Sequence, residues 1–124
     1  MKAETAHIVF KDKFKFKDLQ PVFPELLTVF LQETDQMPDE EEILQMFLKL
    51  NMMDIEKNRK PEGYNRRGRM KMVFPISATK KEFYIRADSK TGETIRVAER
   101  LSKILKKAGI PHILEWDKLQ SIQP

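Results

Sequence analysis

The residues of this sequence best suited to chemistry are the cations of one short stretch and the tyrosine among them. Seven lysines and arginines occur between positions 57 and 71, namely Lys57, Arg59, Lys60, Arg66, Arg67, Arg69 and Lys71. Guanidinium groups bind phosphate oxygens through paired N–H donors, and the ring of Tyr64 can stack on an unpaired base. Gly63 and Gly68 leave the backbone free to approach a ligand closely. The stretch therefore predicts a nucleic-acid-binding loop, and the alternative interpretation is a solvated loop whose charge aids solubility.

A helix near the C-terminal end is expected to present a second basic surface. Apolar residues between positions 97 and 108 recur with the period of about 3.6 that is typical of a helix with one buried face. The opposite face of that helix carries Arg96, Arg100 and Lys103. We predict this face as a secondary nucleic-acid-binding surface, and the sequence leaves open whether it is continuous with the loop at 57–71.

Motifs for catalysis, for cofactor binding and for metal binding are absent from the sequence. It contains no glycine-rich phosphate loop, no GxSxG and no HExxH. Because it has no cysteine, disulfides and thiolate metal sites are excluded. The two histidines, His7 and His112, belong to separate expected strands and lack a nearby set of carboxylate ligands. We therefore predict that the protein is not an enzyme and uses no metal or cofactor.

Four consecutive acidic residues, Asp39 to Glu42, offer a second candidate site, for a divalent cation or a basic partner. Carboxylates in the first turn stabilise a helix without any ligand, because they face the positive end of its dipole. Asp39 and Glu42 also have the spacing of a capping box. We interpret the cluster as the start of a helix.

The elements that must position these residues follow from periodicity. Strict alternation over residues 13–17 predicts a half-buried strand with Phe14 and Phe16 facing inward. One strand from about His7 to Phe16, or two strands joined by a turn at Asp12, both fit this pattern.

Two helices are expected next. The first begins at about Pro24, since proline is accepted in a first turn, and ends near Thr34. The second follows the acidic cluster and stops near Asn51. Its buried face is expected to comprise Ile43, Met46, Phe47 and Leu50.

The second half of the chain is expected to contain three strands and one helix. Strands are predicted at 69–74, 82–86 and 112–116, with the segment DSKTG as a loop. The helix opens at Thr91 or Gly92 and ends at Gly109, beyond which Pro111 prevents its continuation. Residues 116–124 are expected to include a frayed tail.

The resulting order, β-αα-β-β-α-β, is that of a ferredoxin-like split βαβ sandwich, an α+β fold with an antiparallel sheet and helices on one face. A length of 124 residues fits a single domain over 1–124. No apolar run approaches about 18 residues, and the N-terminus does not look like a leader peptide. We therefore expect a soluble, cytoplasmic protein without a membrane partner.

Two segments resemble RNA-binding families. PDEEEILQMFLKLNM followed by RRGRMKM resembles the middle of the 19-kilodalton RNA-binding subunit of the signal recognition particle, which pairs such a helix with a basic segment and an RGR-containing strand. The resemblance covers about a third of the chain. The glycine-arginine-arginine-isoleucine-proline loop of that family has no counterpart before Pro38, so the chain is not assigned to it. KKEFYIRA is similar to the signature of RNA-recognition motifs but lacks its glycine.

The net charge of +4 combines two halves of opposite sign. Residues 1–62 hold nine basic against thirteen acidic residues, a balance of −4, and residues 63–124 hold fourteen against six, a balance of +8. We predict a small nucleic-acid-binding protein, with RNA favoured over DNA because no recognition-helix motif points to duplex readout. The alternative is a protein–protein interaction module, such as an adaptor, inhibitor or assembly factor, that uses this asymmetry toward an acidic protein surface or for self-association.

Overall fold

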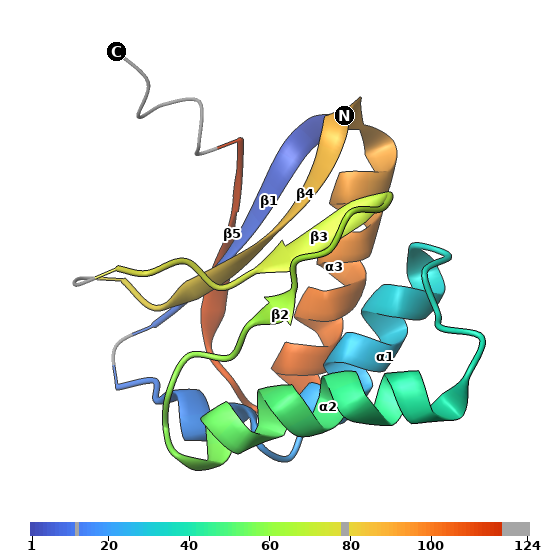
Figure 1. Cartoon of the computed structure of the whole chain (residues 1–124). Coiled ribbons are helices and arrows are strands. Elements are labelled where there is room, and N and C mark those ends of the chain that lie inside the picture. The colour runs from blue at the N-terminus through green and yellow to red at the C-terminus, as the bar shows by residue number, and fades with distance from the viewer. Residues whose placement is uncertain (12, 78–79, 118–124) are drawn as a thin grey trace.

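Five strands form one antiparallel sheet in the computed structural model of the chain, which describes residues 1–11, 13–77 and 80–117 (Figure 1). The strands are β1 (Ala3–Phe10), β2 (Gly63–Tyr64), β3 (Met70–Val73), β4 (Glu82–Thr91) and β5 (His112–Trp116). Their order is β2-β3-β4-β1-β5, and every neighbouring pair is antiparallel. The first strand therefore lies between the last two.

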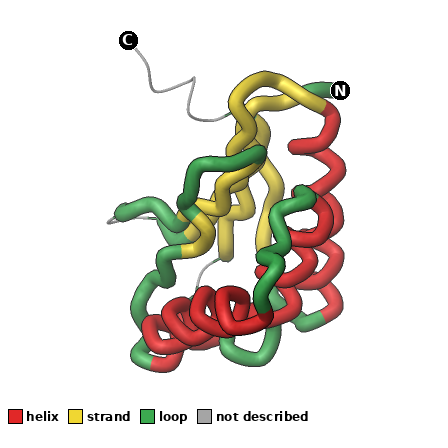
Figure 2. Tube along the Cα trace, turned by 45° about the vertical axis from the view of Figure 1, so that its right-hand side comes forward, coloured by secondary structure: helices red, strands yellow, loops and turns green. Residues whose placement is uncertain are grey.

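Three α-helices in the described part of the chain lie along one side and one end of this sheet (Figure 2). They are α1 (Phe23–Glu33), α2 (Glu41–Glu56) and α3 (Gly92–Lys107), and a 3-10 helix, η1 (Phe16–Leu19), precedes them. α3 packs on β1, β4 and β5, α1 packs on α3, and α2 contacts α1 and η1. The predicted α+β class with an antiparallel sheet is confirmed.

One hydrophobic core joins the sheet to the helices. Alternate residues of β1 and β4, among them Ile8, Phe83 and Ile85, point toward the helices and are fully buried. Phe30 of α1 and Leu101 of α3 belong to the same core. Burying a side chain of this size stabilises a fold by about 1.5–3 kcal/mol. The core therefore determines which face of each element remains for ligands.

The alternating stretch at 13–17 points its aromatic side chains inward as predicted, but it is not a strand. The backbone turns at Lys13, whose φ of 76° lies in the left-handed region, and then enters η1. Phe14 is buried, and its ring stacks on that of Phe10 with the centroids 3.8 Å apart. A turn and a 3-10 helix thus replace the extended backbone while keeping the inward side chains. The turn predicted at Asp12 lies outside the described residues.

α2 continues beyond the predicted stop at Asn51 and ends at Glu56. Asn51 is buried and bonds to β2 instead of ending the helix. Its amide oxygen accepts from the backbone N–H of Gly63 at 2.7 Å, and its amide nitrogen donates to the Gly63 carbonyl at 3.2 Å. The capping box predicted between Asp39 and Glu42 is not formed, since no side chain caps the start of α2.

The predicted buried face of α2 is wrong for three of its four residues. Phe47 is buried, whereas Ile43, Met46 and Leu50 are exposed. Because Asn51 must face β2, the helix is rotated so that it buries Phe47, Asn51 and Ile55. A row of apolar residues is thereby turned toward solvent.

The sheet also extends further than predicted. β4 continues to Thr91, which pairs with Ala3 of β1, so most of the expected DSKTG loop is strand. β2 was not predicted, since two residues are too few to show a period.

The predicted limits of the last helix and the last strand are confirmed. The hydroxyl of Thr91 accepts from the backbone N–H of Glu93 at the start of α3, and Gly109 follows the helix with a φ of 77°. Trp116 belongs to β5, so it is not part of the predicted tail. From residue 118 onward that tail lies outside the described residues.

Candidate anion-binding site

The predicted basic loop is divided between the two ends of the β2–β3 hairpin. Gly63 pairs with Val73 and Tyr64 with Met72, so the chain runs along the hairpin between its two groups of cations. Residues 57–60 come directly after α2, and residues 65–69, here called the hairpin tip, connect β2 to β3 (Figure 1). These cations therefore do not form a single cluster.

Several of the predicted arginines are already paired inside the molecule. Arg59 contacts Asp54 at 3.1 Å, and Arg69 lies 3.8 Å from Asp35. The guanidinium carbon of Arg66 lies 4.6 Å from the ring centroid of Phe47. Lys57, Lys60 and Arg67 make no ion pair with another described residue.

Tyr64 and Lys71 lie on opposite sides of the sheet. The Tyr64 ring packs against the rings of Phe30 and Phe47, with centroid distances of 6.2 and 5.5 Å, and is half-buried. This packing turns it toward the helices and away from a position for base stacking. Lys71 pairs in register with Arg86, on the face opposite the helices.

The cations predicted on α3 are exposed but differ in their partners. Arg96 donates to Glu93 at 2.7 Å and also contacts Glu33 of α1. Hydrogen bonds to Glu93, and then to Glu33, raise the pKa of Arg96. Arg100 and Lys103 are exposed without a carboxylate partner among the described residues.

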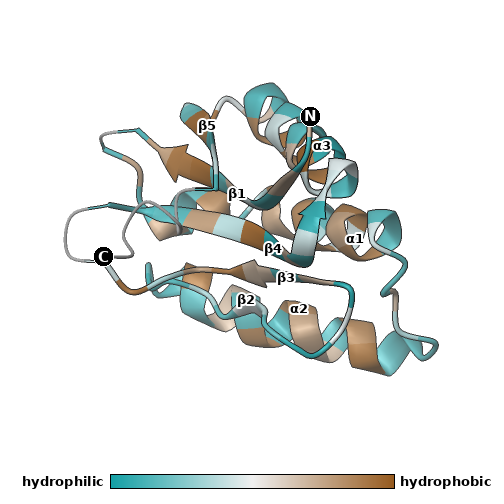
Figure 3. Ribbon diagram, turned by 90° about the horizontal axis from the view of Figure 1, so that it is seen from above, coloured by the Kyte–Doolittle hydropathy of each residue, from teal (hydrophilic) through white to brown (hydrophobic). Residues whose placement is uncertain are grey.

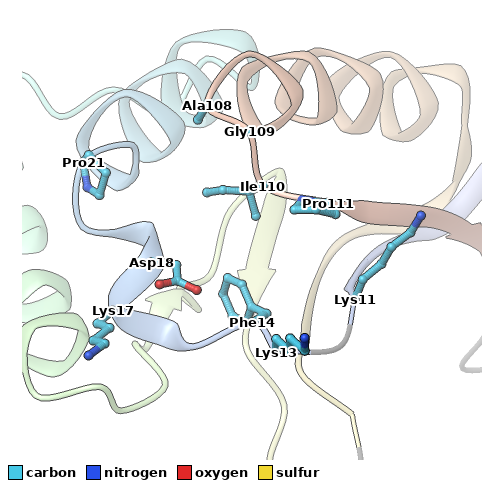
Figure 4. Close-up of a pocket in the computed structure, with 10 residues that line it drawn as sticks. All are labelled: Lys11, Lys13, Phe14, Lys17, Asp18, Pro21, Ala108, Gly109, Ile110 and Pro111. Carbon is cyan, nitrogen blue, oxygen red and sulfur yellow. The ribbon is translucent and has the colours of Figure 1, made fainter.

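A different group of cations surrounds a hollow of about 590 Å³ between the segment after β1 and the turn from α3 to β5 (Figure 4). Its lining includes Lys11, Lys13 and Lys17. A neighbouring hollow adds Lys80 and Lys81, and another adds Lys106. We call these six residues the lysine rim: Lys11, Lys13, Lys17, Lys80, Lys81 and Lys106.

Hydrogen bonds between distant segments hold the lysine rim in place. The backbone N–H of Lys11 donates to the Pro111 carbonyl at 3.2 Å, which joins the segment after β1 to the turn after α3. The ammonium group of Lys81 donates to the Phe14 carbonyl at 3.1 Å. Phe14 and Ile110 supply an apolar floor (Figure 4). Segments that are far apart in sequence thus meet at one place.

Carboxylates among the described residues balance only part of this charge, since Lys80 lies 3.7 Å from Glu115. Asp18 is the one carboxylate among the described residues that line the main hollow, and it accepts a hydrogen bond from the backbone N–H of Lys15 at 2.9 Å. Burial lowers the pKa of the nearby His112, and the charges of Lys106 and Lys11 lower it further, although a hydrogen bond to the Ile110 carbonyl acts in the opposite direction. The hollow can therefore attract an anion.

The first half of the predicted loop lies beside this rim. The backbone N–H of Lys17 donates to the Asn58 side chain at 3.1 Å, so residues 57–60 adjoin the segment that carries Lys17. Sequence reasoning missed the rim because it interpreted residues 13–17 as a strand and did not connect Lys106 with them. The signal was present, since four lysines occur within residues 11–17.

The two histidines lie on opposite faces of the sheet and do not share a site. His7 contacts Glu82 at 2.8 Å on the face away from the helices. His112 faces α3, where its Nε2 lies 2.6 Å from the hydroxyl of Ser102 and its Nδ1 lies 2.8 Å from the Ile110 carbonyl. A serine hydroxyl, a histidine and a group that orients the histidine occur in the same order in sites of nucleophilic catalysis. Because Ser102 is only 3% exposed, the contact acts to tie α3 to β5.

No group of three or more histidine, aspartate or glutamate side chains suited to a metal ion occurs within the described ranges. No helix in the same ranges is both long and apolar enough to cross a membrane. Comparison of the chain with protein-family models, with curated proteins and with solved structures gives no match.

Proposed function

We propose that the protein is a non-enzymatic nucleic-acid-binding protein that holds RNA by its phosphates at the lysine rim. The observation that carries this proposal is the convergence of lysines from three separate segments, 11–17, 80–81 and 106, around adjoining hollows. An ammonium group attracts a phosphate as a point charge, and several of them in a row suit a chain of phosphates better than one small anion.

Single-stranded RNA fits this surface better than duplex DNA. The main hollow, about 590 Å³ in volume, is in the range of pockets that enclose small ligands, and its floor includes Phe14, Ile110 and Pro111. An unpaired base can enter such a space beside its own phosphate, whereas a base inside a duplex cannot. Residues 57–60 of the predicted loop adjoin the segment that carries Lys17, through the hydrogen bond to Asn58.

The strand order supports a related proposal about the fold. Without β2, the order β3-β4-β1-β5 agrees with the strand order of the ferredoxin-like plan, and this agreement supports the proposal. We therefore propose a ferredoxin-like sandwich to which β2 adds an edge strand.

Fluorescence anisotropy with a labelled single-stranded RNA tests the function, with the DNA of the same sequence and its duplex as comparison probes. We expect RNA to bind most tightly and its affinity to fall as salt increases. The variant Lys11→Gln/Lys13→Gln/Lys17→Gln should weaken binding about tenfold and reduce the logarithmic salt slope by about 2, because each phosphate contact contributes about 0.7.

Circular dichroism shows whether that variant keeps its fold. The proposal is contradicted if the wild-type protein binds no RNA at low ionic strength, or if the folded variant keeps both the wild-type affinity and the wild-type salt slope. Equal binding to RNA and single-stranded DNA would contradict the preference for RNA alone.

A further inference from the structure

α2 carries several hydrophobic residues along its length (Figure 3), and one row of them is left exposed by the fold of a single molecule. The row consists of Ile43, Met46, Leu50 and Met53, which are 39–47% exposed. Single exposed apolar residues are ordinary, but a continuous row on one helix marks an interaction surface. Methionine suits such a surface because its flexible side chain adapts to a partner. We call these four residues the α2 seam.

The α2 seam has a charged residue at each end. Asp39 lies two residues before the first residue of α2, and Lys57 directly follows its last residue, while the four seam residues between them repeat every three and four positions. This spacing is that of two helices packed along a shared seam. Asp39 and Lys57 are both exposed, and neither forms an ion pair with another described residue.

The series is symmetric about position 48. When α2 is placed antiparallel to a copy of itself, Ile43 faces Met53 and Met46 faces Leu50. Asp39 then faces Lys57 at both ends, so that each acid meets a cation. A surface that matches itself in this way is the requirement for a contact with two-fold symmetry.

We propose that two copies of this chain associate through the α2 seam as an antiparallel, two-fold symmetric dimer, with Asp39 of each copy paired with Lys57 of the other. A second copy is the occupant that the charge pattern favours, because an acidic residue precedes α2 and a basic residue follows it, so an antiparallel copy brings opposite charges together at both ends. The dimer buries the seam and leaves the six residues of the lysine rim free, so it does not depend on RNA binding.

The flanks of the seam set an upper limit on the strength of this dimer. Lys49 lies beside the two-fold axis and faces Lys49 of the second copy, and Glu42 approaches Glu56 of the second copy. These like charges oppose pairing, and a seam on one 16-residue helix is short. We therefore expect a weak dimer in fast exchange with monomer, of the class formed by small interfaces.

Sedimentation of the full chain over a wide range of concentrations tests the proposal. We expect a monomer–dimer equilibrium in the wild-type protein. Leu50→Asp should raise the dissociation constant at least about tenfold, because it places a charge in the middle of the seam. Ile76→Asp is the matched control, since Ile76 is 92% exposed outside the seam, and it should have no effect.

A charge exchange tests the antiparallel register itself. Asp39→Lys and Lys57→Asp should each weaken the dimer about threefold or more, because each pair occurs twice, and the double variant should restore it. Lys49→Gln should strengthen it by removing repulsion at the axis. Circular dichroism verifies that the overall helix content is unchanged in each variant.

A wild-type chain that stays monomeric at every concentration would overturn the proposal. A folded double variant that does not recover dimerisation would overturn the register and with it the assignment of the second copy as occupant. Neither result would affect RNA binding at the lysine rim, which is measured at protein concentrations where the monomer prevails.

Discussion

The lysine rim and the hairpin tip are both rich in cations, but they differ in the acids that surround them. Near the tip, Arg69 lies beside Asp35, and Arg96 is held by Glu93 and Glu33. At the rim, Lys80 lies 3.7 Å from Glu115, but the other five lysines form no ion pair with a described carboxylate, and Asp18 is the one described carboxylate that lines the main hollow. The density of charge along a sequence therefore does not give its density in space, because the fold brings the neutralising partners from elsewhere.

The largest expected effect is a loss of RNA affinity, and it distinguishes the two regions when the same change of charge is made in each. Lys11→Glu/Lys13→Glu/Lys17→Glu should reduce RNA affinity by about a hundredfold or more, because three phosphate contacts are replaced by repulsion. Arg66→Glu/Arg67→Glu/Arg69→Glu at the tip should reduce it less than about fivefold, through long-range charge alone. Anisotropy titrations at one salt concentration provide the measurement. A larger loss of RNA affinity in the tip variant than in the rim variant would contradict the assignment of RNA binding to the rim.

A second prediction disturbs the hairpin without touching the rim. Asn51→Ala should lower the free energy of unfolding by about 1–3 kcal/mol, because it leaves the buried N–H of Gly63 without a partner. Urea denaturation measures this loss. RNA affinity at low denaturant should stay within about twofold of wild type, since Asn51 contacts no residue of the rim. A loss of affinity in the folded variant would contradict the separation of the two regions.

A third prediction uses pH to detect the environment of His112. Its pKa in the folded protein lies below the ordinary value of 6.5, chiefly because of burial, so the unfolded chain binds the extra proton first. The free energy of unfolding should therefore fall as pH decreases through about 6.5 toward the lower pKa of the folded state, and then level off. His112→Gln should remove most of this dependence in denaturation measured between about pH 7.5 and 5.5.

RNA at the rim should act on the same histidine. Phosphates near Lys11 and Lys106 offset the charges that help to lower the pKa of His112, so this pKa should rise when RNA binds. NMR titration of the imidazole detects the change. A pKa that is the same with and without saturating RNA would argue against binding beside His112.

The smallest expected effect concerns Arg96. Because its ion pairs with Glu93 and Glu33 are at the surface, Arg96→Gln should lower the free energy of unfolding by less than about 1 kcal/mol. RNA affinity should be unchanged within error. A clear loss of affinity would restore α3 as part of the binding surface, as the sequence suggested.

Much of the fold could be predicted because local patterns and the core agree. The apolar period of α3 and the stop at Gly109 are properties of the helix itself, so both were predicted correctly. The rotation of α2 could not be predicted, since it depends on the contact between Asn51 and Gly63 of another element. Apolar residues such as Leu50 indicate burial in general, and the sequence does not state whether the partner belongs to the same molecule.

The candidate site was predicted less well for a related reason. Its lysines are spread over positions 11–106 and become neighbours only when β1, the β3–β4 connection and the end of α3 meet. The stretch at 57–71 attracted notice because its cations are adjacent in sequence. These cations are not adjacent in space, because the β2–β3 hairpin separates residues 57–60 from residues 65–69.

NMR chemical-shift mapping of the protein with a single-stranded RNA tests the central claim most directly, because it locates the contact residue by residue. We predict that the largest changes occur at residues 11–17, 80–81 and 106–112, with smaller ones at 57–60. Changes concentrated at residues 65–71 and on the outer face of α3, with the rim unaffected, would contradict this account.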